Sequence, residues 1–203
     1  MEKKEFRILA SLSDKTGIIT FIGGLQDLFE LEVLSTGGTA KTIRDAGIKV
    51  QEVSDYIGYP EILDGRVKTL HPIIHGGLLG NLGNPAHVAQ MKEQGIKPIH
   101  MVVVNLYPFE ATVAKPGCTI TEAIENIDIG GVALLRAAAK NHLHVIPLCD
   151  HRDYPEVLYT LVKEKNLTPK KRLALATKVF RHTAGYDKAI SDYLEVKQQG
   201  PLY

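Results

Sequence analysis

The sequence lacks the features of several protein classes. It contains no tryptophan and two cysteines among 203 residues, and aromatic residues make up 6% of the chain. Cys118 and Cys149 stand alone in different segments. This excludes the paired spacing of a zinc site or a redox motif, and we expect both thiols to be inert.

The chain also lacks long apolar runs and an excess of charge of either sign. No run approaches the length that spans a bilayer, and the start, Met1–Glu5, lacks the apolar stretch of a secretion signal. We therefore expect a cytoplasmic protein. Lys and Arg total 24 against 23 for Asp and Glu, a net charge of +1. This balance argues against nucleic acid or a membrane as a partner, so any basic cluster is local.

The apolar content is sufficient for a large core. Hydrophobic residues make up 44% of the chain, which fits one domain with a core at 1–150 and a helical extension of the same domain at 151–203. No repeat, low-complexity stretch or long linker interrupts it.

Strand and helix patterns alternate along the core. We expect strands at 6–12, 31–34, 48–53, 99–104 and 144–148. Helical spacing follows at 18–28, around 43–46, at 121–126 and at 132–141. The last third is expected to be helical, with one face formed by Leu173, Ala176, Phe180, Thr183, Ile190 and Leu194. The alternation predicts an α/β fold with a mostly parallel central sheet, which binds ligands beyond the carboxyl ends of its strands.

Two turns at predicted strand ends suit an anion. Ser13–Gly17 places Ser13, Asp14, Lys15 and Thr16 before a helix, and Ser35–Thr39 places Thr36, Gly37, Gly38 and Thr39 before the next. Backbone N–H groups at helix starts bind phosphate. Each turn alone could be an ordinary helix cap, and neither is a P-loop or a dinucleotide fingerprint. Together they predict a site for one phosphomonoester.

A third polar segment, Asp64–His71, follows no helical or strand period. Gly65 and Pro72 interrupt regular backbone structure, and between them lie the polar residues Arg66, Lys68, Thr69 and His71. The composition alone would fit a solvated basic loop. The neighbouring phosphate turns favour a segment that contacts an anionic small molecule.

Further polar groups follow the strongest strand. Asn105 and Tyr107 offer hydrogen-bond groups for a planar amide or heterocycle, although Tyr before Pro is often only a rigid turn. Asp128 precedes a helix that carries Arg136 and Lys140 in its last turns. Charge alone would explain this as helix capping. The functional interpretation is a carboxylate and a lysine that move protons.

The histidines do not form a metal-binding pattern. His71 and His75 are four residues apart, but no glutamate follows His71, and His142, His144 and His151 show no matching ligand set. We expect no metal, with His71 as a supporting donor and His75 within a packed helix after Pro72.

With these motifs in order, the chain resembles the inosine monophosphate (IMP) cyclohydrolase domain of the bifunctional purine biosynthesis proteins that also carry an AICAR transformylase. The matching motifs are Ser13–Gly17, Ser35–Ala40, Asp64–Pro72, Asn105–Phe109, Asp128–Gly131 and Arg136–Asn141. The resemblance implies a methylglyoxal synthase-like three-layer sandwich with a C-terminal helical extension. The implied reaction closes 5-formamidoimidazole-4-carboxamide ribotide (FAICAR) to IMP with loss of water and without a cofactor.

The resemblance also implies roles for individual residues. The ribotide phosphate and ribose would lie against Ser13, Asp14, Lys15, Thr16, Thr36, Gly37, Gly38 and Thr39. The base would contact Arg66, Val67, Lys68, Thr69, Val104, Asn105, Asp128, Ile129, Gly130 and Gly131. We expect Lys68 and Tyr107 to stabilise charge on the formyl oxygen, and Asp128 and Lys140 to transfer protons.

Partners follow from the same resemblance. It implies a homodimer and a separate AICAR-formylating enzyme, because the transformylase part is absent. Gly80-Asn81 replaces a small and a basic residue of the family, which puts a minor contact at the rim of the site in doubt. Residues 197–203 are either a natural terminus or a cut at a domain boundary.

Two other functions remain open at this stage. Methylglyoxal synthase shares the implied fold and a similar phosphate turn, but eliminates phosphate from a triose. A regulatory nucleotide-binding module would need the phosphate turns but has no use for Lys68, Tyr107, Asp128 and Lys140 together.

Overall fold

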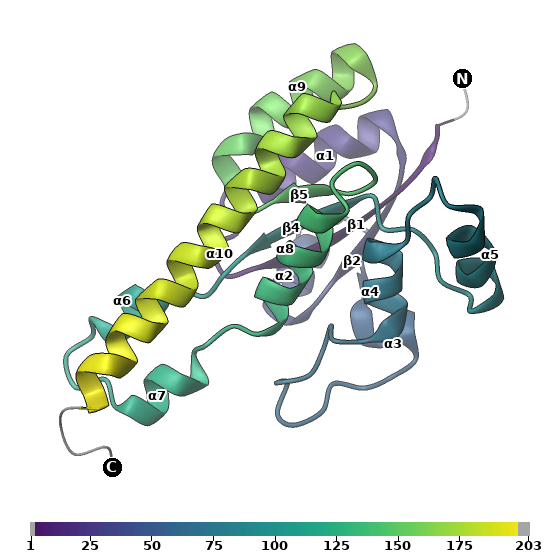
Figure 1. Cartoon of the computed structure of the whole chain (residues 1–203). Helices are drawn as coiled ribbons and strands as arrows, with labels where there is room; N and C mark the ends of the chain where they lie inside the picture. Colours follow the sequence, from purple (N-terminus) through teal and green to yellow (C-terminus); the bar gives the residue numbers. More distant parts are fainter. Residues whose placement is uncertain (1–2, 199–203) are drawn as a thin grey trace.

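The computed structural model describes residues 3–198 and contains a parallel sheet between two layers of helices (Figure 1). Its strands are β1 (Glu5–Leu12), β2 (Glu30–Ser35), β3 (Gln51–Glu52), β4 (Met101–Asn105) and β5 (Ile146–Leu148). They are arranged in the order β3-β2-β1-β4-β5, and every pair is parallel. The predicted α/β class is confirmed, and within these strands the sheet is wholly parallel.

The helices vary widely in length. Their bounds are α1 (Ile18–Leu28), α2 (Gly37–Asp45), α3 (Val53–Ile57), α4 (Pro72–Leu79), α5 (Pro85–Glu93), α6 (Phe109–Val113), α7 (Ile120–Glu125), α8 (Gly130–Lys140), α9 (Tyr154–Glu164) and α10 (Pro169–Gln198). None of the helices within residues 3–198 is both long and apolar enough to cross a membrane.

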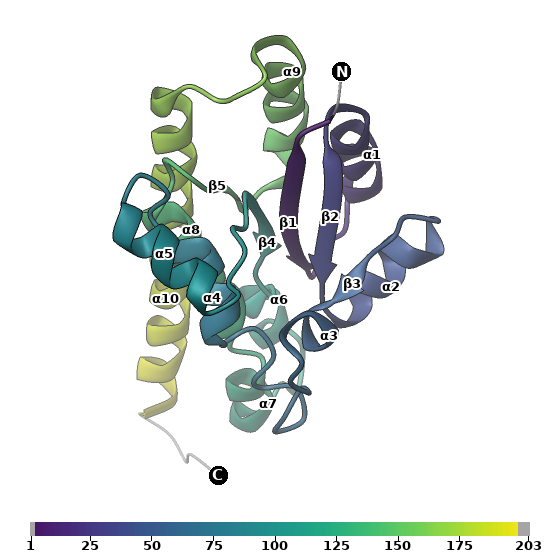
Figure 2. The same cartoon turned by 90° about the vertical axis from the view of Figure 1, so that its right-hand side faces the viewer.

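Two apolar clusters fill the spaces on either side of the sheet. One face of β1 and β4 presents Ile8, Ala10, Met101 and Val103 to α1 and α9, and the other presents residues such as Leu9 to α4, α8 and α10. The unbroken apolar run of β4 therefore reflects burial on both faces, as expected for a parallel strand between helices. In the view of Figure 2, α1 and α2 lie on one side of the sheet, and α4, α8 and α10 lie on the other.

The third predicted strand is largely wrong. We expected a strand at 48–53, but only Gln51 and Glu52 pair with β2, and Val53 already begins α3. Ile48 and Val50 pack against the core, but they lie outside the β2–β3 pairing. Burial at the sheet edge produced the strand pattern here without strand pairing.

The C-terminal helix is confirmed, and its buried face is partly the expected one: Ala176 and Thr183 are buried as predicted. Its buried residues are Arg172, Leu175, Ala176, Val179 and Thr183. The predicted members Leu173 and Phe180 are 54% and 39% exposed. Phe180 instead lies under the guanidinium of Arg136, 5.4 Å from the ring centroid. This side of α10 packs against α8 and β5. It includes the buried Arg172, which a search for apolar residues at helical spacing does not find.

Candidate active site

The two predicted phosphate turns meet at the carboxyl ends of β1 and β2. The side chain of Lys15 crosses from the first turn to the second: its Nζ lies 4.0 Å from where a β-carbon on Gly38 would stand. Gly37 and Gly38 are exposed and open α2, so their N–H groups have no partner within the helix. Gly37 has φ +47°, a conformation that favours glycine. An ammonium thus lies beside N–H groups that have no partner within the helix, as an anion site requires.

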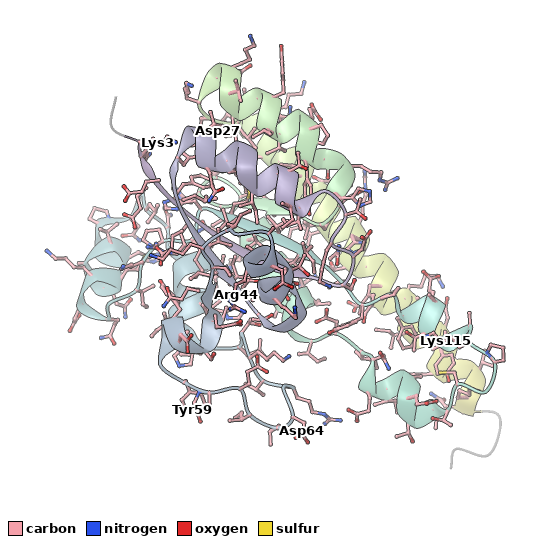
Figure 3. All side chains as sticks on the ribbon, turned by 180° about the vertical axis from the view of Figure 1, so that it is seen from behind. Lys3, Asp27, Arg44, Tyr59, Asp64 and Lys115 are labelled. Atoms are coloured by element: carbon pink, nitrogen blue, oxygen red, sulfur yellow. The ribbon has the colours of Figure 1, made fainter. Side chains whose placement is uncertain are left out.

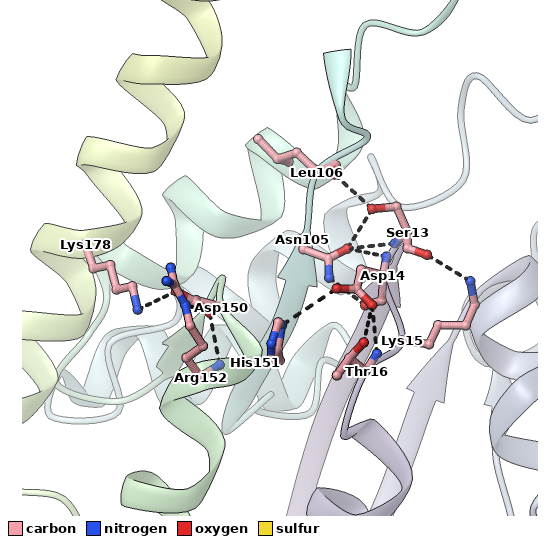
Figure 4. A network of polar contacts seen from close by, with 10 residues as sticks. All are labelled: Ser13, Asp14, Lys15, Thr16, Asn105, Leu106, Asp150, His151, Arg152 and Lys178. Atoms are coloured by element: carbon pink, nitrogen blue, oxygen red, sulfur yellow. Dashed lines mark hydrogen bonds and ion pairs between the residues drawn. The ribbon is translucent and has the colours of Figure 1, made fainter. Parts of the chain in front are cut away.

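Thr39 and Asn105 hold these turns in place. The hydroxyl of Thr39 accepts a hydrogen bond from the N–H of Leu12 at 2.9 Å and donates to its carbonyl at 3.0 Å. Asn105 Oδ1 accepts hydrogen bonds from the backbone N–H groups of Ser13 and Asp14, and Nδ2 donates to the carbonyl of Asp14 (Figure 4). Both side chains were predicted to contact substrate. In the structure their polar atoms bind backbone groups of the first turn and so shape it.

The segment around Asp64 forms a loop that extends from the body of the protein. Tyr59 and Asp64 lie at its outer edge (Figure 3). Ile62 and Val67 form an isolated antiparallel bridge, and the turn between them has positive φ at Leu63, Asp64 and Gly65. Gly65 has φ +83°, a conformation that favours glycine, and the end of the Lys68 side chain lies directly against it.

Side chains of this loop contact two other parts of the site. The guanidinium of Arg66 pairs with Glu125 of α7, and Lys68 Nζ lies 3.4 Å from Glu61. Thr69 is buried, and its Oγ1 would lie 3.1 Å from a β-carbon on Gly130. Thr69 therefore lies against the first turn of α8.

Asp128 has the most distinctive electrostatic environment of the predicted catalytic residues. Burial raises the pKa of its carboxyl, and hydrogen bonds from the backbone N–H groups of Gly131 and Tyr107 oppose the rise. The bond from Gly131 to Oδ1 is 2.7 Å long. A half-buried carboxyl with a raised pKa accepts a proton more readily than an ordinary aspartate does. Its contact with the Tyr107 backbone also joins α8 to the end of β4.

Three further predicted residues have contrasting surroundings. Val104 is 1% exposed and its side chain packs in the core, so only its backbone can reach the strand ends. Lys140 ends α8, whereas Asp128 precedes it. The helix has 11 residues, and at a rise of about 1.5 Å per residue its ends are roughly 16 Å apart. Ile129 is 60% exposed and points away from the core.

The turn after β5 is a neighbour of the site that sequence reasoning passed over. His151 Nδ1 lies 3.7 Å from Asp14 Oδ2 (Figure 4). The pKa of the Asp14 carboxyl is lowered, mainly because it accepts two hydrogen bonds from Thr16. Cys149-Asp150-His151 follows a predicted strand, and this position at a strand end was the available signal.

A cavity of about 800 Å³ lies on the β5 side of the Ser13 turn. One side is formed by Ser13, Asp14 and Asn105, and Lys178 and Arg181 of α10 contribute to the other. Lys178 pairs with Asp150 at 2.8 Å. Lys15, Lys68 and Asp128 are absent from its lining, so it adjoins the catalytic candidates without containing them.

The histidines have structural roles near the loop. His71 precedes α4, and its Nδ1 accepts a hydrogen bond from the N–H of Ile73 at 3.3 Å, so it acts as an acceptor where we predicted a donor. His75 lies within α4 as expected, and burial lowers its pKa. Across residues 3–198, no three His, Cys, Asp or Glu side chains are grouped to hold a metal ion.

Comparison with known families agrees with this architecture. The model of the MGS-like domain matches residues 17–133, which is more than half of the chain. The chain belongs to the MGS-like domain family. A second model, the AICARFT/IMPCHase bienzyme, matches residues 138–202. The MGS-like match includes the end of β4 and Asp128, and the bienzyme match includes Lys140 and α10.

Individual relatives of this MGS-like chain are bifunctional enzymes. The chain is 55% identical over 194 residues to the bifunctional purine biosynthesis protein PurH of Bacillus mycoides, and 56% identical over 189 residues to that of Neisseria gonorrhoeae. These alignments cover 96% and 93% of the chain but only 38% and 36% of the relatives. The crystal structure of ForH superimposes with a TM-score of 0.82 at 37% identity, over 93% of this chain and 98% of that one.

Proposed function

We propose that the chain is an IMP cyclohydrolase, which closes FAICAR to IMP with loss of water in purine biosynthesis. The observation that carries the proposal is the 55% identity to a PurH protein over 96% of the chain. The joined phosphate turns support it, because they suit the phosphate of a ribotide. No observation in the structure favours methylglyoxal synthase or a regulatory module.

Ring closure requires the substrate to be held in a folded conformation. The carboxamide nitrogen is a poor nucleophile and the formamide carbon a poor electrophile, so proximity and charge stabilisation supply most of the rate. In our proposal Lys15, Thr36 and the N–H groups of Gly37 and Gly38 bind the phosphate. The loop side chains Arg66, Lys68 and Thr69 then face the base and its formamide. The bond formed joins the carboxamide nitrogen to the formyl carbon, and no cofactor is needed.

The charges that develop have partners at this edge of the sheet. Lys68 and Tyr107 stabilise negative charge on the formyl oxygen as the nitrogen attacks. Asp128 accepts the proton that leaves the nitrogen, and its raised pKa suits this role. The formyl C–O bond then breaks. The oxygen departs as water with this proton and with the proton that the formamide nitrogen releases as its double bond to the formyl carbon forms. Proton transfer of this kind contributes about 10² to 10⁴ in rate.

Lys140 requires a second copy of the chain in this mechanism. It lies at the opposite end of α8 from Asp128, so the two side chains of one chain do not share a substrate. We propose a homodimer in which Lys140 of one copy protonates the departing hydroxyl in the site of the other. The reciprocal arrangement gives two equivalent sites.

The chain spans little more than a third of the PurH proteins that it matches. The test is an absorbance assay of ring closure with FAICAR in a metal-free buffer containing a chelator. IMP formation at a rate proportional to enzyme supports the proposal. No turnover of FAICAR, or methylglyoxal formed from dihydroxyacetone phosphate, contradicts it.

A further inference from the structure

A tyrosine of the C-terminal helix reaches the segment that carries Asp128. The backbone N–H of Asp128 donates a hydrogen bond to the hydroxyl of Tyr186 at 2.8 Å, and this hydroxyl lies 3.5 Å from the carbonyl of Asn126. Tyr186 lies 58 residues further along the chain, in α10. One side-chain hydroxyl of α10 thus contacts an N–H group and a carbonyl of the segment that leads into α8.

The ring of Tyr186 contacts the other arm of the site. Phe109 follows Tyr107 and Pro108, is 2% exposed, and meets the Tyr186 ring edge to face at a centroid distance of 6.3 Å. Tyr193, two turns further along α10, meets Phe109 in the same way at 5.6 Å. Since the Tyr107 backbone also lies close enough to the Asp128 carboxyl to oppose the rise in its pKa, Tyr186 contacts both segments at the point where they join.

We propose that Tyr186 is a positioning residue for ring closure: its hydroxyl fixes the backbone of Asp128, and its ring fixes the Tyr107 segment through Phe109. The inference rests on the proposed cyclohydrolase function and extends the site to α10. Without the hydroxyl, the N–H of Asp128 is a part-buried donor that has lost its hydrogen-bond acceptor. The carboxyl could then rotate away from the Tyr107 N–H, with no loss of phosphate contacts.

Tyr193 supplies a matched control. It lies on the same helix and packs on the same ring, but within residues 3–198 its buried hydroxyl has no hydrogen-bond partner. Tyr186→Phe and Tyr193→Phe therefore remove the same atom from similar rings. Only the first variant removes a bond to the Asp128 segment.

The experiment measures FAICAR closure, IMP binding and thermal unfolding for the full chain and both variants. Tyr186→Phe should lower kcat about fivefold to tenfold, the factor that one lost hydrogen bond represents. KM and the dissociation constant of IMP should change less than about twofold, because the phosphate contacts stay intact. The acidic side of the kcat–pH profile should shift along the pH axis relative to wild type, because the surroundings of Asp128 change. Tyr193→Phe should leave all of these values unchanged.

Three outcomes would overturn the inference. These are an unchanged kcat and pH profile in Tyr186→Phe, an equal loss in Tyr193→Phe, or a loss that follows only the unfolded fraction at the assay temperature. Failure of the wild-type chain to close FAICAR would instead contradict the proposed function. The activity of the wild-type chain therefore tests the proposed function, and the difference between the two variants tests the role of Tyr186.

Discussion

The side-chain oxygen of Asn105 accepts a hydrogen bond from the backbone N–H of Ser13 at 2.7 Å, which ties the end of β4 to the turn after β1. The same amide also binds the N–H and the carbonyl of Asp14. The turn that we assign to the ribotide phosphate therefore takes its shape from a neighbouring strand. This relationship leads to the first prediction.

Asn105→Ala should destabilise the protein and weaken nucleotide binding. It removes hydrogen bonds to two backbone N–H groups and a carbonyl, at a cost of about 2–3 kcal/mol in unfolding free energy. Denaturant unfolding and IMP titration calorimetry check both effects. Asn84→Ala is the control, because Asn84 caps the remote helix α5 and should lose about 1 kcal/mol with unchanged IMP affinity. Equal IMP affinity in both variants would contradict the role of Asn105.

Lys15→Met should weaken IMP binding about 10-fold to 100-fold, the range for loss of a charge-assisted hydrogen bond. Its thermal stability should change little, because within residues 3–198 the Lys15 ammonium binds only the carbonyl of Ser13, at 3.2 Å. Lys41→Met is the matched control: its ammonium lies on α2 but pairs with Asp45 at the surface. A Lys15 variant that binds IMP as tightly as the Lys41 variant would rule out the proposed phosphate contact.

Gly131→Ala should abolish most of the activity while the fold is retained. A β-carbon there would lie 2.6 Å from Asp128 Oδ2, so the carboxylate must move and loses its 2.7 Å bond to the Gly131 N–H. We expect kcat to fall at least about 10-fold. Gly185→Ala meets no atom within 4 Å in the middle of α10. It should raise stability by about 0.5–1 kcal/mol with normal turnover.

The raised pKa of Asp128 predicts a specific pH dependence of stability. A carboxyl whose pKa is higher in the folded than in the unfolded state binds more protons when folded. Its contribution to the unfolding free energy is therefore full below the ordinary aspartate pKa of 3.8, and is lost as pH rises through the folded value. The Asp128→Asn variant has no carboxyl to protonate, so its unfolding free energy lacks this contribution. It should also lose turnover.

Denaturant titrations of wild type and Asp128→Asn between about pH 3.5 and 7.5 check the sign. The unfolding free energy of the variant relative to that of wild type should increase as pH rises above the ordinary aspartate pKa of 3.8. A difference that stays constant with pH, or that decreases, would contradict the assigned shift.

The proposed sharing of sites between two copies predicts complementation. Asp128→Asn and Lys140→Ala should each be inactive alone. After the two variants are unfolded and refolded together in equal amounts, half of the dimers are mixed and one of their two sites is intact, so activity should recover to roughly a quarter of wild type. Normal turnover by Lys140→Ala alone would remove Lys140 from the mechanism. No recovery on mixing would exclude shared sites.

Local sequence patterns were sufficient for most of the secondary structure and for the approximate position of the site. The unbroken apolar residues of β4 and the polar turns at Ser13 and Thr36 each predicted an element or a strand end within a short window. Such patterns are reliable where burial and hydrogen bonding depend on neighbours in the chain. They were unreliable at 48–53, where the apolar pattern reflects packing at the sheet edge, and in α10, where burial depends on the helices that it meets.

The sequence by itself determined which groups are available: two polar turns that suit an anion, a basic loop and a carboxyl before a helix. Only the tertiary structure decided how they are used. It assigned Asn105 and Thr39 to shaping the turns, separated Lys140 from Asp128 by the length of α8, and brought Tyr186 to the Asp128 backbone from 58 residues away. The physical reason is that hydrogen-bond partners and burial arise from packing between distant segments, which no local pattern records.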